Sequence, residues 1–79
     1  MRAMPETFLR AHAARFASLT KRERQVLAGI SGGLSSGVLA KTLFLSVETV
    51  DTHRRNLRKK LQTNSNFELG QYARAFNLI

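Results

Sequence analysis

Residues 46–61 of this chain read SVETVDTHRRNLRKKL. On a helix of about 100° per residue, Val50, Leu57 and Leu61 fall within about 40° of one another and form an apolar stripe. The opposite side carries polar and charged side chains, which are Glu48, Asp51, Thr52, Arg55 and Lys59. We therefore predict a helix over residues 47–62 that buries one face and offers hydrogen-bonding groups and cations to solvent on the other.

A shorter helix is predicted before this segment, across a tight turn. Ser46 suits the N-cap of the longer helix and Ser35 that of the shorter one, because a serine oxygen accepts a hydrogen bond from a free backbone N–H of the first turn. The shorter helix has an expected apolar face of Val38, Leu39 and Leu43, a small Ala40 where another helix crosses, and apolar anchors at Leu34 and Leu45. Two short helices joined in this way, the second with a basic face, are typical of a helix-turn-helix. Such a helix fits the major groove of B-DNA.

Further helices are predicted on both sides of this unit, and no strand is. Thr20 and Glu23 have the spacing of a capping box, at the start of a helix that stops at Gly32-Gly33. Upstream, the apolar spacing over residues 6–18 predicts a short amphipathic helix, which either packs on the domain or ends a linker. Its stripe is Phe8, Leu9, His12, Phe16 and Leu19, with Pro5 suited to the first turn.

The last helix is predicted over residues 67–77, after a turn at residues 63–66. Its apolar side chains are Leu69, Tyr72, Ala73 and Phe76, with Leu78 and Ile79 closing the end. We expect Leu69 and Ala73 to pack inward, while Tyr72 and Phe76 partly face a partner. The fold class is thus all-α, with residues 1–18 as an N-terminal helix or linker and residues 19–79 as the domain.

The composition excludes several classes of protein. A chain of 79 residues has room for one small core, so any receiver or sensor module would lie outside it. The chain has no cysteine, which excludes disulfides, zinc fingers and thiol catalysis. No apolar run approaches the roughly 18 residues of a membrane span, and no secretory signal is visible. We expect a cytoplasmic, nucleoid-associated protein without membrane contact.

The charge indicates a polyanionic partner. Thirteen Lys and Arg against five Asp and Glu give a net charge of +8. Five of the seven residues from Arg54 to Lys60 are basic and none is acidic. A basic run on one helix is the electrostatic pattern of a nucleic-acid binder. A solvated basic surface without a ligand is the plainer alternative.

Three segments together resemble the LuxR family (also called GerE or NarL/FixJ) of bacterial DNA-binding domains. Residues 19–27, LTKRERQVL, are similar to the family's opening LTxREREVL. The scaffold helix is matched by Gly33-Leu34-Ser35, Leu39-Ala40 and Leu43. The recognition helix is matched by Ser46, Thr49-Val50, His53, Asn56-Leu57 and Lys60-Leu61. The resemblance covers about residues 19–79, without gaps.

The resemblance implies a four-helix domain of a transcription regulator that binds duplex DNA as a homodimer through its last helix. Carried over by position, the base-facing residues would be Asp51, Thr52 and Arg55. The phosphate-contacting residues would be Ser46, Thr49, Arg54, Arg58 and Lys59, and the dimer contacts Leu69, Tyr72, Ala73 and Phe76. Members usually end a longer chain that carries a receiver or another sensor module, and RNA polymerase is a further candidate partner.

The chemistry of these side chains fits DNA readout. Arg55 can pair bidentately with guanine O6 and N7, although a solvated arginine is the alternative. Asp51, where the family commonly has lysine, can accept a hydrogen bond from cytosine N4, or pair with Arg55 one turn along the helix. Thr52 can contact a thymine methyl group or be an ordinary surface threonine without a DNA contact. Val38 stands where the family often has glutamate, which removes a second capping box.

Rival functions have less support in the sequence. No nucleophile–base pair or metal cluster is visible, so we predict no enzyme, no catalytic residue, no metal site and no cofactor. His53 lacks a neighbouring ligand, which favours packing or a phosphate contact. A binder of acidic proteins or membranes would need the apolar stripe exposed. A sigma-factor promoter-reading domain shares the LTxRER opening but lacks the spacing from His53 to Asn56.

Overall fold

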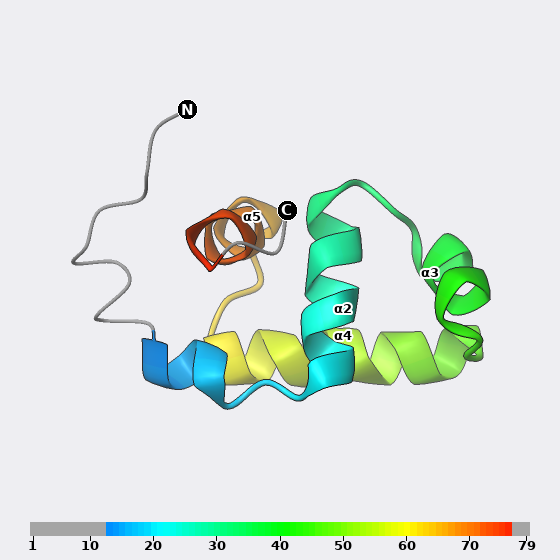
Figure 1. The fold of residues 1–79 in the computed structure, drawn as a ribbon, viewed down its shortest axis with the longest axis horizontal. Helices are drawn as coiled ribbons and strands as arrows, with labels where there is room; N and C mark the ends of the chain where they lie inside the picture. Colours follow the sequence, from blue (N-terminus) through cyan, green and yellow to red (C-terminus); the bar gives the residue numbers. More distant parts are fainter. Residues whose placement is uncertain (1–12, 77–79) are drawn as a thin grey trace.

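The computed structural model describes residues 13–76, and this part of the chain is all-α. A helical segment at residues 13–17 is followed by four helices, α2 (Lys21–Ser31), α3 (Ser36–Leu43), α4 (Val47–Leu61) and α5 (Asn66–Ala75). Helix α4 runs along the longest axis, α2 crosses it steeply, and α3 and α5 lie towards its opposite ends (Figure 1). The predicted fold class is confirmed, because residues 13–76 contain no strand.

The predicted helix starts are confirmed by their N-cap hydrogen bonds. The Glu23 N–H donates to Thr20 Oγ1 at 3.1 Å, and the Thr20 N–H donates to Glu23 Oε1 at 2.9 Å, which completes the capping box. Ser35 and Ser46 each accept a bond from the N–H three residues ahead, at 3.2 and 3.0 Å. These local bonds fix where α2, α3 and α4 begin and therefore how sharply the chain turns between them.

Three helix ends use a left-handed residue, which is Gly33 after α2, Phe44 after α3 and Gln62 after α4. Gly33, after α2, has a φ of 87°, as the Gly-Gly prediction requires. Phe44, after α3, has a φ of 58°, a region that favours glycine. The Leu45 N–H then donates to the Ala40 carbonyl at 2.9 Å and closes the last turn of α3. The tight connection to α4 is thus built from a phenylalanine, which gives no sequence signal for this conformation.

The core contains the stripe predicted on α4. Val50, Leu57 and Leu61 are buried, and Leu27 and Leu69 from α2 and α5 are buried with them. The full core is Phe16, Leu19, Val26, Leu27, Leu39, Ala40, Val50, Leu57, Leu61, Leu69, Tyr72 and Ala73. Because α4 contacts both α2 and α3, its opposite face is held outward.

The described part of the N-terminal segment packs on the domain. Phe16 and Leu19 belong to the core, and the Phe16 ring stacks on Phe76 with centroids 4.2 Å apart. The Arg24 guanidinium lies over the same ring at 4.8 Å from its centroid. The predicted positions of Pro5, Phe8, Leu9, His12, Leu78 and Ile79 lie outside the described residues.

Two apolar positions of the scaffold helix region differ from the prediction. Val38 is 46% exposed and Leu34 is 39% exposed, so neither is part of the core. Leu39 and Ala40 instead fill the contact of α3 with the rest of the domain. Helix α3 has only eight residues, so the two on its inward side, Leu39 and Ala40, are enough to pack it against the domain.

In the last helix, most of the residues predicted as dimer contacts are buried within the monomer. Leu69 and Ala73 are fully buried, as expected, but Tyr72 is only 3% exposed and its hydroxyl lies 3.3 Å from the Leu61 carbonyl oxygen, to which it donates. These three side chains belong to the monomer's own core, so as folded they offer no surface to a partner. A domain this small needs α5 to cover α4 and α2. Phe76 alone of the four is partly exposed.

A buried ion pair joins α2 to α4. Lys60 Nζ lies 2.8 Å from Glu23 Oε1 and donates a second bond to the Ser18 carbonyl at 3.2 Å. Burial by itself raises the pKa of Glu23, but hydrogen bonds from Lys60 and from the Thr20 N–H, with the charge of Lys60, lower the pKa below its ordinary value. The glutamate predicted only as a cap therefore also anchors α4.

Gly29 on α2 lies against the Leu39 side chain of α3 and gives a stability prediction. A Cβ at Gly29 would lie 2.2 Å from Leu39 Cδ2, so Gly29→Ala displaces a core side chain and should lower the free energy of unfolding by about 1–2 kcal/mol. At Gly37 in α3 the nearest atom is Ser35 Oγ at 3.8 Å, and Gly37→Ala should instead stabilise by about 0.5–1 kcal/mol. Urea unfolding measures the free energy of unfolding of both variants. If both substitutions changed it equally and in the same direction, the close packing at Gly29 would be contradicted.

Candidate nucleic-acid interface

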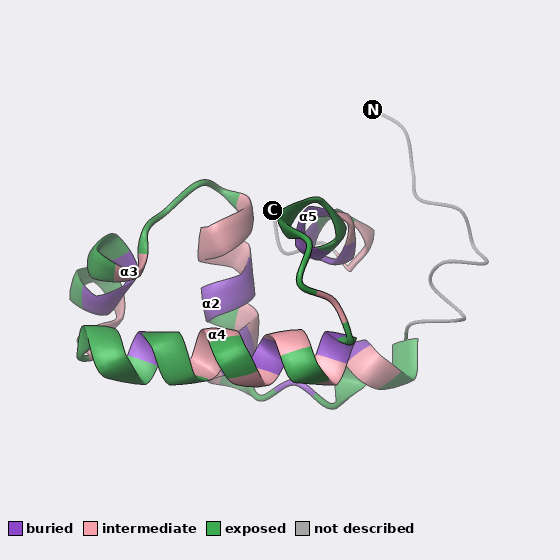
Figure 2. Ribbon diagram, turned by 180° about the vertical axis from the view of Figure 1, so that it is seen from behind, coloured by how far each residue is buried: buried purple, intermediate pink, exposed green. Residues whose placement is uncertain are grey.

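The outward face of α4 is polar along its whole length. Opposite the buried stripe, the exposed residues are Glu48, Asp51, Thr52, Arg55 and Lys59, the same five that the helical periodicity predicts. Figure 2, which shows the molecule from behind, has α4 in front of α2, with exposed stretches alternating with buried and intermediate ones along the helix. The α4 backbone is packed against α2 and α3, so this face is presented by a rigid element.

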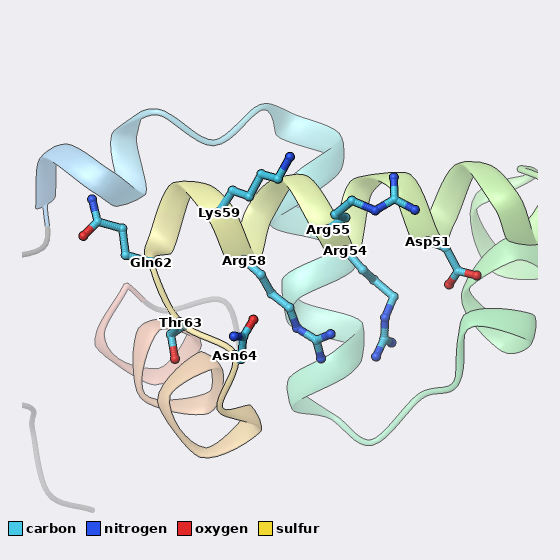
Figure 3. Close-up of a pocket in the computed structure, with 8 residues that line it drawn as sticks. All are labelled: Asp51, Arg54, Arg55, Arg58, Lys59, Gln62, Thr63 and Asn64. Atoms are coloured by element: carbon cyan, nitrogen blue, oxygen red, sulfur yellow. The ribbon is translucent and has the colours of Figure 1, made fainter.

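The face borders a groove, called here the basic groove. It is lined by Asp51, Arg54, Arg55, Arg58, Lys59, Gln62, Thr63 and Asn64 (Figure 3). Four of these eight side chains are cationic and one is anionic. Arg54 and Arg58 extend to one side of α4, while Arg55 and Lys59 extend to the other (Figure 3). Cations on both sides of a helix suit the two phosphate strands that flank a major groove.

Arg58 is held in place by the start of α5. Its Nη2 donates to Asn66 Oδ1 at 3.1 Å, which orients the guanidinium over the turn at residues 62–65. Its Nε is buried without a hydrogen-bond partner among the described residues, a cost of about 1–3 kcal/mol.

The hydroxyl groups at the N-terminal half of α4 are engaged in local bonds. Ser46 Oγ donates to Thr49 Oγ1 at 2.9 Å and accepts from the Thr49 N–H. Thr52 Oγ1 donates to the Glu48 carbonyl at 3.0 Å. These residues do not line the basic groove, although all three are exposed. Each oxygen can still accept a bond, and the methyl group of Thr52 remains available for apolar contact.

Asp51 has a different partner from the one predicted. Its Oδ1 accepts a hydrogen bond of 2.7 Å from Ser36 Oγ on α3, and the ion pair with Arg55 does not form. The ion pair found within residues 13–76 is that of Lys60 with Glu23. The helix-spacing rule for Asp51 and Arg55 is therefore overridden by a tertiary contact, and both side chains keep exposed surface at the groove.

Sequence reasoning missed four residues of this interface. Ser36 holds Asp51, and Gln62, Thr63 and Asn64 close the end of the groove. The three groove residues were expected only as helix end and turn. A polar turn placed directly after a basic helix is the signal that could have indicated their role. Ser36 gives no such signal, because its partner lies 15 residues away.

Other kinds of site find no support in the described part of the chain. Within residues 13–76 no group of three His, Cys, Asp or Glu side chains could hold a metal ion. His53, the histidine of α4, is half-buried beside the stripe. Of the helices described, none has the length and apolarity needed to cross a membrane.

Comparison with known proteins agrees with this geometry. Residues 17–73 match the family of bacterial regulatory proteins known as the luxR family, or GerE. The chain is 44% identical over 61 residues to the transcriptional regulatory protein FixJ of Bradyrhizobium diazoefficiens, covering 77% of this chain and 30% of that protein. It is 40% identical over 58 residues to the oxygen regulatory protein NreC of Staphylococcus carnosus, covering 73% and 27%.

A third relative is shorter in its overlap but closer in sequence. The nitrate/nitrite response regulator protein homolog of Haemophilus influenzae is 52% identical over 48 residues, covering 61% of this chain and 23% of that protein. The chain thus spans less than a third of the length of these relatives. No solved structure matches the chain. The family match covers most of the chain and includes every residue of the basic groove, so the chain belongs to the LuxR family of bacterial regulatory proteins.

Proposed function

We propose that this chain binds duplex DNA with sequence specificity and serves as the output domain of a cytoplasmic transcription regulator acting on the nucleoid. Helix α4 enters the major groove, Asp51, Thr52 and Arg55 face the bases, and the remaining cations hold phosphates. The observation that carries the proposal is the division of α4 into a fully buried stripe and an exposed polar face bordered by the basic groove, in a domain of a regulatory family. The domain has no catalytic role in this proposal.

Phosphate contacts are assigned to the residues beside this face. Arg54, Arg58 and Lys59 line the basic groove, and Ser46 and Thr49 lie at the N-terminus of α4, where the helix dipole favours an anion. Phosphate contacts position a protein on DNA but carry no sequence information. The register they set brings Arg55 to the base edges.

A homodimer on an inverted repeat is part of the proposal. Because Leu69, Tyr72 and Ala73 are used by the core and Phe76 packs against Phe16, the contact would be made by the outer side of α5, where Phe67 is 69% exposed. A two-fold axis through α5 would present two copies of α4 to half-sites of one operator. An upstream sensor module and RNA polymerase remain proposed partners of the longer protein.

The rival functions lose their support. The family match favours the LuxR domain over the sigma-factor alternative. A membrane or acidic-protein binder would need an exposed apolar face beside the cations, but the stripe of Val50, Leu57 and Leu61 is buried.

Arg55→Ala tests the proposed readout. We expect wild-type protein to select a motif from a random duplex pool, and Arg55→Ala to lose about 1–3 kcal/mol of discrimination at one base pair, because a bidentate arginine–guanine pair is lost. Fluorescence anisotropy with duplexes that differ at single base pairs gives the measurement.

Lys59→Ala is the matched control, since it removes one charge from the next turn of the same exposed face. It should weaken all duplexes alike and reduce the salt dependence. If no motif emerges, or if Arg55→Ala also weakens all duplexes alike, α4 binds DNA only through phosphates and the proposed specificity is wrong.

A further inference from the structure

We propose that Ser36 is a positioning residue that aims the Asp51 carboxylate at a cytosine in the DNA major groove. The inference rests on the proposed function, because it requires α4 to face base edges. It goes beyond that function by assigning a base to Asp51 and a specificity role to the scaffold helix.

The geometry ties the carboxylate to a second helix. Ser36 is the first residue of α3 and is half-buried, while Asp51 lies on the exposed face of α4. The Ser36 hydroxyl donates to Asp51 Oδ1 at 2.7 Å, a short, charge-assisted bond. One carboxylate oxygen is thereby fixed, and Oδ2 remains an acceptor whose direction is set by two packed helices instead of by a flexible side chain.

The hydrogen bond from Ser36 also keeps Asp51 away from the arginines. Arg54 and Arg55 follow Asp51 by three and four residues, the spacings at which a helix forms ion pairs. Neither forms one with Asp51 in the structure, and the three side chains point in different directions in Figure 3. Without the serine hydroxyl, the carboxylate would be free to turn onto a guanidinium, which would neutralise both groups for base contact.

The free acceptor selects among the four bases by their major-groove edges. Guanine offers two acceptors, and thymine offers an acceptor and a methyl group, so both repel a carboxylate. Adenine offers an amino donor with the N7 acceptor beside it. Cytosine offers the N4 amino group with no acceptor on its own edge. The Asp51 carboxylate lies near the DNA phosphates, where its negative charge lowers the affinity for DNA. A cytosine at this position best explains why a carboxylate stands there.

The test compares base preference, thermal stability and overall affinity in the full 79-residue chain. After a motif is selected from a random pool, four duplexes that differ only at the base pair read by Asp51 are titrated by anisotropy. We expect Asp51→Ala to lower the preference for cytosine about tenfold and Ser36→Ala to lower it about threefold. Ser36→Thr retains the hydroxyl and should keep the preference within about twofold of wild type.

Thr42→Ala is the control on the same helix. Its hydroxyl donates to the Val38 carbonyl within α3 and does not reach α4, so the variant should leave base preference unchanged. Neither serine variant alters the net charge, so affinity for non-specific duplex should stay within about twofold of wild type.

The outcomes separate this inference from the function on which it rests. If Asp51→Ala loses the cytosine preference but Ser36→Ala keeps it, the positioning role is wrong and the proposed function stands. If Ser36→Ala lowers the melting temperature and weakens all four duplexes alike, the hydrogen bond is structural only, and the inference is likewise overturned. If wild-type protein shows no preference for any base pair, the proposed function fails and the inference fails with it.

Discussion

Lys60→Met is expected to lower the free energy of unfolding by about 2 kcal/mol at pH 7. The substitution keeps the apolar stem of the side chain but leaves the buried Glu23 carboxylate without its cation. Removing one partner of a buried ion pair costs about 3–5 kcal/mol. The lysine side chain is 35% exposed, and the carboxylate retains its bond from the Thr20 N–H, so the loss should lie below that range.

The pH dependence of this loss identifies its cause. The pKa of Glu23 is lowered on folding from its ordinary value of 4.5, so its contribution is present above that pH and is lost as the pH falls through the folded value. Wild-type protein should therefore lose stability as the pH falls below about 4.5. In Lys60→Met, burial still raises the pKa of Glu23 and the lysine no longer offsets this effect, so the loss of stability on acidification should be smaller.

Lys59→Met is the matched control, because it removes the same charge from an exposed neighbour. It should change stability by no more than about 0.5 kcal/mol. Glu23→Gln combined with Lys60→Met should recover part of the stability, since no uncompensated charge remains buried. Urea unfolding at several pH values measures all four proteins. Equal losses for Lys59→Met and Lys60→Met would show that the effect comes from net charge and not from the ion pair.

The same residues show what the sequence could and could not predict. Thr20, Ser35 and Ser46 were recognised as caps because a cap is a local interaction, complete within one helical turn. The buried and exposed faces of α4 followed from helical periodicity for the same reason. Lys60 was recognised as part of the basic run, but its contact with Glu23 spans 37 residues and depends on how α2 crosses α4. The spacing of residues within one helix cannot predict how α2 and α4 cross.

The residues of the candidate interface likewise divide into those predicted from local spacing and those set by contacts between helices. Arg55 could be assigned to the exposed face from its angle on the helix, whereas the phosphate role of Arg54 and Arg58 came from the family resemblance. Asp51 was assigned to that face correctly but given the wrong neighbour, because the competing hydroxyl comes from α3. The apolar stripe of α5 was identified, yet the sequence could not tell core from partner contact. Tyr72 reaches the Leu61 carbonyl across the helix packing, and that contact puts it in the core.

Replacing Arg54 and Arg58 together by glutamine is expected to weaken duplex DNA binding about 30- to 100-fold at low salt. Both side chains line the basic groove on the same side of α4 (Figure 3) and are assigned to phosphates. Each phosphate contact contributes about 0.9 to the slope of log affinity against log salt concentration. The double variant should therefore lose close to two units of slope, and should do so for operator and non-specific duplexes alike.

Stability measurements separate this loss of affinity from a loss of fold. Arg58 donates to Asn66 but also carries a buried Nε with no partner among the described residues, so its removal should change the free energy of unfolding by less than about 1 kcal/mol.

Arg74→Gln is the control for charge, because Arg74 is exposed in the last turn of α5 and does not line the groove. It should leave the salt slope within about 0.3 of wild type. A double variant that unfolds readily, or that keeps the wild-type slope, would contradict the assignment. A variant that stays folded, loses slope and keeps its base preference would establish that these two arginines hold the backbone while their neighbours on the exposed face read the bases.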